Sequence, residues 1–240
     1  MIKTINIKQE NNNIITIDGP AGSGKSTIAK MLAKELKLNY IDTGAMYRAI
    51  TLLAIENKID LNDEKSILGI AKKSDLKFDN TVEDIDKYTK VLLNGKDITL
   101  EIRSKKVGEA VSIVSKLSAV RKYLVNLQRE MALKSPSVLE GRDTGSVVCP
   151  GAICKIYLTA SIDERVERRK KQLCRNNQSS LEDQIKCEIE TRDKIDSSRN
   201  DSPLIVPDGA EVIDTTCMNI GEVFNFIKDI YIKKLKSVKN

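Results

Sequence analysis

The sequence predicts an α/β fold built around a mostly parallel sheet, and three observations lead to this class. Short apolar runs alternate with amphipathic helical patterns along most of the 240 residues, which is the rhythm of βαβ units. A glycine-rich segment, Gly19–Ser26, lies between the first apolar run and the first helical pattern. The chain contains no internal repeat and no low-complexity linker, and its length suits one large domain or a core with sizeable insertions.

The first three elements are expected to be a strand, a helix and a second strand. Ile14–Ile17 is a short apolar run that ends at an Asp-Gly-Pro turn, so it predicts a buried strand. After the glycine-rich segment, apolar residues recur every four positions at Ile28, Leu32 and Leu36, which predicts one face of a helix. A second strand at Leu38–Ile41 and a helix from about Ala45 to Glu56 are expected to follow.

The middle of the chain departs from this alternation. Two runs, Tyr88–Leu93 and Asp97–Thr99, flank Asn94-Gly95. Asn-Gly between two such runs predicts a tight β-hairpin, because both residues accept the positive φ angles that the turn needs. Two helices are expected after the hairpin, at about Ile102–Val114 and Ala119–Leu133.

The alternation resumes in the last part of the chain. Strands are expected at Val138-Leu139, Ile153–Leu158 and Val212-Ile213. Three helix starts are expected, at the capping box Ser161–Glu164, at Ser180–Asp183 and at Asn219. An α/β core interrupted by two excursions, roughly at 60–135 and 165–200, accounts for the whole pattern.

Composition excludes several classes of function. The chain has no histidine, which removes histidine triads, His–Cys zinc sites and histidine general bases. Aromatic residues make up 4% and the net charge is a modest +6, so no nucleic-acid partner is expected. The five cysteines are odd in number and form no CxxC pair, which predicts reduced, mostly buried thiols in a cytoplasmic protein. Neither a signal peptide nor a membrane span is expected.

The glycine-rich segment satisfies the full phosphate-loop pattern G-x-x-x-x-G-K-[ST] from Gly19 to Ser26. Glycines let successive backbone N–H groups turn toward one point, and the following helix N-terminus adds positive potential there. Lys25 is then expected to reach the β- and γ-phosphates, and the Ser26 hydroxyl to help hold Mg²⁺. The segment therefore predicts a site for a nucleoside triphosphate.

Two other classes of phosphate-loop protein fit less well. Asn57-Lys58-Ile59-Asp60 matches a guanine-recognition pattern, but it lies close behind the loop at the end of an expected helix, so we interpret it as a helix end and a turn. A remodelling ATPase needs an acid after a strand, and Glu140 follows Val138-Leu139. Gly141 and Arg142 come next, and an arginine there suits a site that also holds a second phosphate.

Arginine is concentrated in the segment that begins at Arg142, the residue expected beside a second phosphate. The chain prefers lysine, 29 to 11, yet seven of the 11 arginines lie between positions 142 and 199. Phosphoryl transfer needs forked, always-charged donors that hold the phosphates and neutralise charge on the transferred group. We therefore interpret the charged segment as a lid that closes over ATP and expels water.

Five motifs together resemble the bacterial-type cytidylate kinases, in a match that runs from about Ile15 to Thr216. They are I-D-G-P-A-G-S-G-K-S-T (Ile17–Thr27), D-T-G-A-M-Y-R (Asp42–Arg48), E-I-R-S (Glu101–Ser104), E-G-R-D-T-G-S-V-V (Glu140–Val148) and R-D-x-x-D-x-x-R (Arg192–Arg199). The adenylate kinase pattern D-G-x-P-R is a poorer match to Gly141–Thr144. One departure is Leu100, where a small residue is common before the E-I-R-S motif.

The resemblance implies a P-loop three-layer fold with a parallel sheet, an NMP-binding insertion that contains a small antiparallel sheet, and a short helical lid. The kinase domain would span 14–236, with the insertion at about 43–135, the lid at about 163–200, and a polar extension at 1–13. The chain would act as a monomer on small-molecule nucleotides, and would transfer the γ-phosphoryl group of Mg·ATP to CMP, and also to dCMP, in pyrimidine metabolism.

The resemblance also implies roles for individual residues. Lys25, Arg142, Arg168, Arg169 and Arg199 would be catalytic. ATP would be bound by Gly19, Pro20, Ala21, Gly22, Ser23, Gly24, Lys25, Ser26 and Thr27. Mg²⁺ would be bound by Ser26, with Glu140 acting through water. In the acceptor site, Arg48, Arg142 and Arg199 would bind the phosphate, Ser112, Arg121 and Asp143 the cytosine edge, and Arg192 and Asp196 the ribose, with Thr43 and Tyr47 lining the site.

Two alternatives remain at this point. One is a P-loop kinase for another small acceptor, such as UMP, shikimate or dephospho-coenzyme A. The other is a nucleotide-binding switch or nucleic-acid ATPase, whose ATP hydrolysis would be stimulated by a macromolecule. ADP release with a panel of nucleoside monophosphates would separate them.

Overall fold

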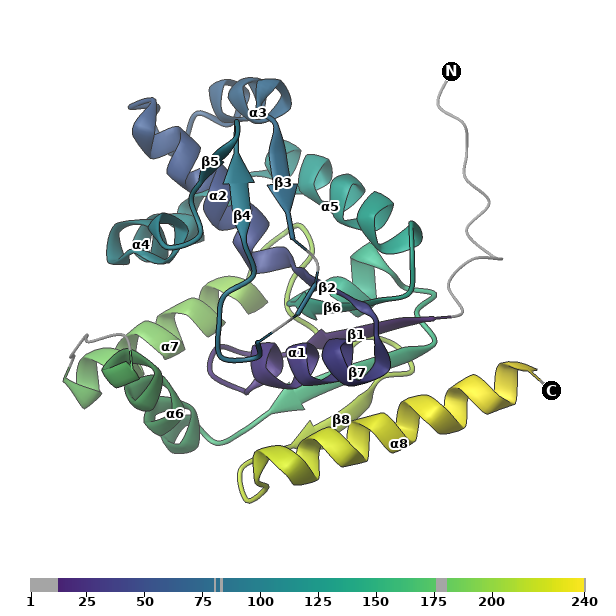
Figure 1. Ribbon diagram of the computed structural model, residues 1–240. Coiled ribbons are helices and arrows are strands. Elements are labelled where there is room, and N and C mark those ends of the chain that lie inside the picture. The colour runs from purple at the N-terminus through teal and green to yellow at the C-terminus, as the bar shows by residue number, and fades with distance from the viewer. Residues whose placement is uncertain (1–12, 80, 83, 176–180, 240) are drawn as a thin grey trace.

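A five-stranded, fully parallel sheet forms the centre of the molecule in a computed structural model that describes residues 13–79, 81–82, 84–175 and 181–239 (Figure 1). The strand order is β2-β6-β1-β7-β8. The strands are β1 (Ile14–Asp18), β2 (Asn39–Asp42), β6 (Ser137–Gly141), β7 (Cys154–Thr159) and β8 (Glu211–Asp214). The expected α/β class with a parallel sheet is confirmed.

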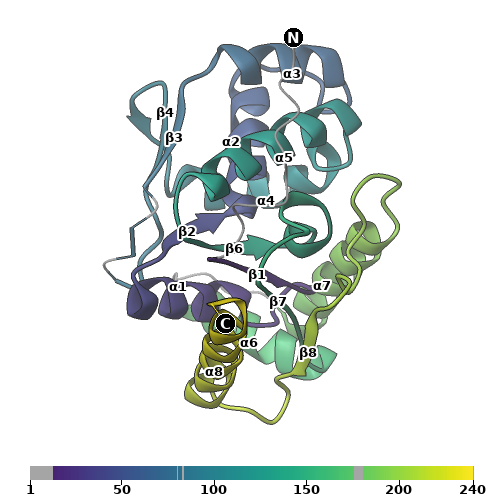
Figure 2. The same cartoon turned by 90° about the vertical axis from the view of Figure 1, so that its right-hand side faces the viewer.

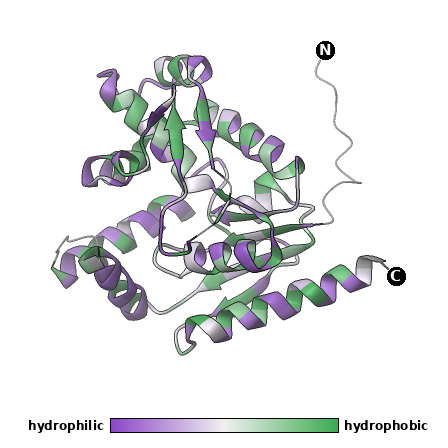
Figure 3. Ribbon diagram, viewed as in Figure 1, coloured by the Kyte–Doolittle hydropathy of each residue, from purple (hydrophilic) through white to green (hydrophobic). Residues whose placement is uncertain are grey.

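Helices cover both faces of this sheet, so the core has three layers (Figure 2). Alternate residues of a strand point to opposite faces: Ile15 and Ile17 pack against α1 and α8, whereas Ile14 packs against α5 and the segment that follows β6. Every residue of β1 is buried. The central strands β1 and β7 consist mostly of hydrophobic residues, as expected for a doubly covered parallel sheet, whereas α6 is strongly hydrophilic (Figure 3).

The helices follow the sequence patterns closely in the core. They are α1 (Lys25–Leu36), α2 (Thr43–Glu56), α3 (Glu64–Lys73), α4 (Lys105–Val114), α5 (Ser118–Leu133), α6 (Ile162–Arg175), α7 (Glu182–Ser197) and α8 (Ile220–Lys239). Asn219 opens α8 through a reciprocal capping box with Glu222, with N–H to side-chain distances of 2.8 and 3.0 Å. At the end of α2, Lys58 has a left-handed φ of 55°, so the interpretation of 57–60 as a helix end and turn is confirmed.

Helices α2 to α5 and a second sheet form a separate region beside the sheet edge. That sheet is antiparallel, in the order β3 (Leu76–Phe78), β4 (Val91–Leu93) and β5 (Lys96–Asp97). Asn94 and Gly95 join β4 to β5 with φ angles of 50° and 82°. The predicted Asn-Gly hairpin is therefore confirmed, because this turn requires positive φ at both residues.

Several expected boundaries were wrong. The helix expected at 102–114 is divided into a short 3₁₀ turn, η1 (Glu101–Arg103), and α4, because the Ser104 hydroxyl caps α4 by accepting from Val107 N–H at 3.4 Å. The strand expected from Tyr88 begins only at β4, and α3 and β3 were not predicted. Leu100 is 72% exposed, so its size does not disturb the turn.

Other expectations are only partly met. The Ser161 hydroxyl accepts from Glu164 N–H at 3.3 Å, but Ser161 N–H donates to Thr216 instead of Glu164, so the capping box is half formed. All five cysteines are free, but only Cys149 and Cys154 are buried, so the expectation of mostly buried thiols was wrong. Ser180 and residues 1–12 of the polar extension lie outside the described residues. Within the described ranges, no helix is long and apolar enough to cross a membrane.

Candidate active site

The phosphate loop connects β1 to α1 at the carboxyl edge of the sheet, as its sequence pattern predicts. Gly19, Gly22 and Gly24 have positive φ angles of 148°, 78° and 91°, which side chains with a Cβ rarely adopt. At Gly19 a Cβ would also lie 2.0 Å from the Leu158 carbonyl oxygen. The glycines therefore allow both the turn and the close approach of the loop to β7.

Lys25 folds back over its own loop. Its ammonium donates to the Pro20 carbonyl at 2.6 Å and to the Ser23 hydroxyl at 3.2 Å, and the residue is buried. Burial, followed by the charge of Arg142, lowers the pKa of Lys25 well below its ordinary value. A buried ammonium whose charged form is destabilised in this way is stabilised when an anion binds beside it.

Beside the loop, the Glu140 carboxylate accepts hydrogen bonds from two hydroxyl groups. Ser26 donates to Glu140 Oε2 at 2.7 Å, and the Tyr40 hydroxyl donates to Oε1. Thr43 donates to the Glu140 backbone carbonyl at 2.7 Å. Burial and the nearby Asp42 raise the pKa of Glu140, although the hydroxyl donors and Lys25 act in the opposite direction. Ser26 at the start of α1, Tyr40 on β2, Thr43 on α2 and Glu140 on β6 thus present oxygen atoms at one place.

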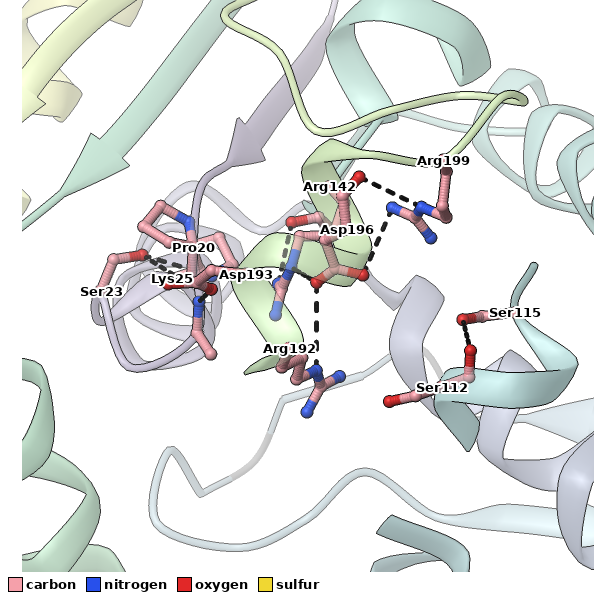
Figure 4. Close-up of polar contacts among 12 residues, drawn as sticks. Pro20, Ser23, Lys25, Ser112, Ser115, Arg142, Arg192, Asp193, Asp196 and Arg199 are labelled. Atoms are coloured by element: carbon pink, nitrogen blue, oxygen red, sulfur yellow. Dashed lines mark hydrogen bonds and ion pairs between the residues drawn. The ribbon is translucent and has the colours of Figure 1, made fainter. Parts of the chain in front are cut away.

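Across from Lys25, arginines surround the carboxylate of Asp196 (Figure 4). Arg142 Nε lies 2.8 Å from Asp196 Oδ2, Arg199 Nη2 lies 3.5 Å from Oδ1, and Arg192 Nε lies 4.0 Å from Oδ2. The predicted residues that follow β6 (Arg142), lie on α7 (Arg192 and Asp196) and follow α7 (Arg199) are therefore brought together. Although burial works against it, these three guanidinium groups hold the pKa of Asp196 below its ordinary value.

This arginine cluster, which we define as Arg48, Arg142, Arg192 and Arg199, has more positive charge than its surroundings neutralise. Burial, then the charges of Arg142 and Arg48, lowers the pKa of Arg192 to about 9. Burial also lowers the pKa of Arg48 to about 10, with Arg103, Arg169 and Arg142 adding to the effect against the opposite pull of Asp42. Burial is the largest cause of both shifts and neighbouring arginines add to it, whereas Asp196 and other carboxylates raise the pKa of Arg142 against the effect of its burial. A bound anion would relieve the charge at Arg48 and Arg192.

A second group of predicted residues forms a buried polar wall on the far side of the cluster. Arg121, only 2% exposed, donates to Asp143 and to the Ser115 carbonyl at 2.9 Å, and its guanidinium lies 5.1 Å from the Tyr47 ring centre. Arg121 Nε and the Tyr47 hydroxyl are buried and have no hydrogen-bond partner among the residues that the structure describes. The Ser112 side chain points toward the space beside Arg192 (Figure 4).

The two arginines expected in the lid differ in their contacts. Arg168 donates to the Thr215 hydroxyl and carbonyl at 2.9 and 2.7 Å and pairs with Glu164 at 2.8 Å, so it ties α6 to the end of β8. Arg168 also donates to the Ser23 carbonyl of the phosphate loop at 3.4 Å. Arg169 donates to Gln172 at 2.7 Å. Its positive charge contributes to lowering the pKa of Arg48 and of Arg192. Of the two, Arg168 therefore contacts the donor loop, whereas Arg169 lies near the arginine cluster.

Sequence reasoning missed residues that hold the site in place. Asp18 accepts from the Thr144 N–H and hydroxyl and from Gly145 N–H at 2.7–2.8 Å, and so fixes the turn η2 (Thr144–Val148) that follows Arg142 and Asp143. Asp193 and Arg165 contact the phosphate loop. The D-G-P context of Asp18 was the available signal, whereas nothing local indicates a partner 126 positions away.

Comparison with known proteins points to one family. The family model described as "Cytidylate kinase" matches residues 15–233. The curated cytidylate kinase of Pediococcus pentosaceus is 47% identical over 214 residues, which cover 89% of this chain and 92% of that protein. The cytidylate kinase of Caldanaerobacter subterraneus is 44% identical over 222 residues, which cover 92% of this chain and 96% of that protein.

Proposed function

Because the chain belongs to the cytidylate kinase family and phosphorylates CMP with ATP as donor, we propose that its phosphate loop binds the ATP phosphates and that its arginine cluster binds the CMP phosphate. The observation that carries this assignment is the unbalanced positive charge. Two cationic groups, Lys25 on one side and the arginine cluster on the other, face each other with their pKa values lowered at Lys25, Arg48 and Arg192. Two anionic phosphates, one from each substrate, would neutralise the positive charge at Lys25 and at the arginine cluster.

Within the acceptor site, Arg48, Arg142 and Arg199 are assigned to the phosphate, and Arg192 with Asp196 to the ribose. Asp196 supports this division because it holds Arg142 at 2.8 Å while its second oxygen faces Arg199 at 3.5 Å. A guanidinium that is fixed by a carboxylate on one edge presents its remaining N–H groups in a set direction. Within the described residues, the buried Arg199 Nη2 makes no hydrogen bond and has only this 3.5 Å ion pair with Asp196, which is consistent with a hydrogen-bond partner supplied by the substrate.

Recognition of cytosine is assigned to Ser112, Arg121 and Asp143, with Tyr47 and Thr43 lining the site. Cytosine differs from uracil in its donor amine at N4 and its acceptor at N3. Arg121 is always a donor, and its free Nε suits N3 or O2, whereas the Ser112 hydroxyl and the Asp143 carboxylate are acceptors for the amine. Uracil, with a donor at N3, would leave a buried donor unpaired.

Magnesium fits the oxygen atoms at the start of α1. The Ser26 hydroxyl and Glu140 Oε2 are 2.7 Å apart, and Mg²⁺ prefers oxygen ligands, of which the protein supplies few and the phosphates and water the rest. Ser26 is assigned as the direct ligand and Glu140 as the residue that acts through water. When bound, the ion neutralises charge on the β- and γ-phosphates.

The chain's own residues then supply position and charge for the transfer. Lys25 would leave Pro20 for the phosphates, and the arginine cluster would hold the CMP oxygen in line with the γ-phosphorus. Arg169 would neutralise charge that develops on the transferred group when α6 and α7 close. We assign residues 43–135 to an NMP-binding insertion and 163–200 to the lid, within one kinase domain at 14–236.

A panel of acceptors tests the site map. The rate of ADP release would be measured with CMP, dCMP, UMP and AMP for the parent and for Arg48→Lys. We expect CMP to exceed UMP by at least ~10-fold in kcat/KM, dCMP to be accepted, AMP to be poorer still, and Arg48→Lys to weaken all acceptors alike through their shared phosphate. The map is wrong if Arg48→Lys changes the choice of base. Monomeric state, cytoplasmic location and the absence of a nucleic-acid partner stay predictions.

A further inference from the structure

The lid helices grip one residue of the phosphate loop by both of its backbone groups. The Asp193 carboxylate on α7 accepts from Ala21 N–H at 3.0 Å. Arg165 on α6 donates from Nη1 to the Ala21 carbonyl at 3.1 Å, and the same Nη1 pairs with Asp193 Oδ2. A second Arg165 donor, Nε, bonds to the Ala160 carbonyl at 3.1 Å and so anchors the guanidinium.

Packing brings the same segments together independently of these bonds. The Ala21 methyl packs against the small apolar core of α6 and α7, formed by Val166, Leu173, Ile185 and Ile189. At Gly22 an added Cβ would lie 3.0 Å from the Arg165 carbonyl oxygen and 3.1 Å from its Cβ. Since Gly22 also has a φ of 78°, this part of the loop has no room for a side chain and lies directly on α6.

We infer that Asp193 is a positioning residue for the donor triphosphate, and that Asp193 with Arg165 forms a latch that holds the phosphate loop in its binding conformation. The inference rests on the proposed donor site at the loop. With Ala21 N–H turned to the Asp193 carboxylate, the amides that follow it are left to face the phosphates. Arg165 and Asp193 satisfy each other's charge, being 12% and 20% exposed, so the latch needs no ligand to form.

The latch also connects the two halves of the active site. Asp193 follows Arg192 directly and precedes Asp196 by three positions on α7. Neighbouring positions of one rigid helix thus contact the phosphate loop on one side and the arginine cluster on the other (Figure 4). Movement of α7 on closing would therefore shift the donor loop and the acceptor groups together.

Steady-state kinetics with both substrates varied test the latch in Asp193→Ala, Asp193→Asn, Arg165→Ala and the double alanine variant. Glu190→Gln, an exposed acid on the same helix, is the matched control. We expect Asp193→Ala to raise the KM for ATP and lower kcat, with kcat/KM for ATP falling ~10–100-fold, the scale of a hydrogen bond to a charged group. The KM for CMP and the CMP/UMP ratio should stay within about 3-fold of the parent, since the acceptor contacts remain.

The conservative variant and the double variant separate a latch from a merely structural contact. Asp193→Asn keeps an acceptor for Ala21 N–H, so its loss should lie between those of the parent and Asp193→Ala, and it decides the question if the alanine variant is unstable. The double variant should lose no more than the worse single variant, because both residues act on Ala21. Losses that add instead would mean that Arg165 binds phosphate itself and would overturn the latch.

Two further results are decisive. Asp193 variants that match Glu190→Gln, or that raise the KM for CMP but not for ATP, would refute the positioning role. Lys25→Met distinguishes this failure from failure of the proposed donor site. If Lys25→Met is inactive while the Asp193 variants are normal, only the latch is wrong, whereas an active Lys25→Met would show that the donor site itself is elsewhere.

Discussion

Replacing Lys25 by Met should abolish most of the activity without weakening the fold. Methionine keeps an apolar side chain of similar length in the buried loop but removes the ammonium that donates to Pro20 at 2.6 Å and to Ser23 at 3.2 Å. Removing one electrostatic stabiliser of a transition state lowers the rate ~10²–10³-fold, or about 2.7–4 kcal/mol. We expect a loss of that size in kcat/KM.

The effect on stability should be small, for a reason visible in the structure. The pKa of Lys25 is lowered in the folded protein, first by burial and then by Arg142, so at neutral pH the charged ammonium destabilises the nucleotide-free fold relative to the unfolded chain. This penalty disappears only as the pH rises toward the ordinary pKa of 10.5. Pro20 keeps the Ser23 hydroxyl as a donor at 3.0 Å, so the variant should lose less than about 1 kcal/mol.

Two measurements check this prediction together. Denaturant unfolding with and without ATP should give a nucleotide-free variant as stable as the parent. The gain in stability from ATP should be smaller, because stabilisation by a bound ligand rises with the logarithm of its affinity. Lys72→Met, at an exposed position on α3, is the control. A variant with more than about a tenth of the parent's kcat/KM, or one that loses over about 3 kcal/mol of stability, would refute the reasoning.

Three further predictions address specificity, the lid and pH. Ser112→Ala should shrink the CMP/UMP ratio in kcat/KM by at least ~5-fold without changing the unfolding midpoint, and an unchanged ratio would remove Ser112 from the base site. Arg169→Lys should lower kcat at least ~10-fold with little change in the KM for ATP. Arg168→Lys should mainly lower the thermal midpoint of unfolding, because Arg168 holds Thr215 by two hydrogen bonds. A loss of kcat in Arg168→Lys and a loss of stability in Arg169→Lys would contradict this assignment. Burial raises the pKa of Asp18 from 3.8 to about 6, so protonation below pH 6 should loosen η2 and reduce kcat/KM for CMP. The same carboxyl should add about 2 kcal/mol to the free energy of unfolding as the pH falls from 6 to 4, and a pH–rate profile that is flat across pH 5–7 would exclude the role.

The local part of the structure could be predicted from the sequence, because its causes lie within a few residues. The phosphate loop follows from glycines and Lys25 inside one eight-residue pattern, and the hairpin from Asn94-Gly95. The parallel core follows from apolar runs that alternate with helical patterns. Helix α3 also had a readable signal that was overlooked, since Asp63 caps it by accepting from Ser66 N–H at 3.0 Å and Ile67 and Ala71 are buried one turn apart.

Only the tertiary structure decided which charged side chains face the substrates and which hold distant segments of the chain together. The sequence alone determined that this chain has a phosphate loop on a parallel α/β core, and that most of its arginines lie between positions 142 and 199. It could not assign Arg168 to Thr215, Asp18 to η2, or Asp193 to Ala21, which lies 172 positions away. These bonds depend on which helix faces cross at the sheet edge, and no periodicity or local spacing encodes a crossing between segments so far apart. The number of charged donors is a property of the sequence, but their division between substrate and scaffold is decided by packing.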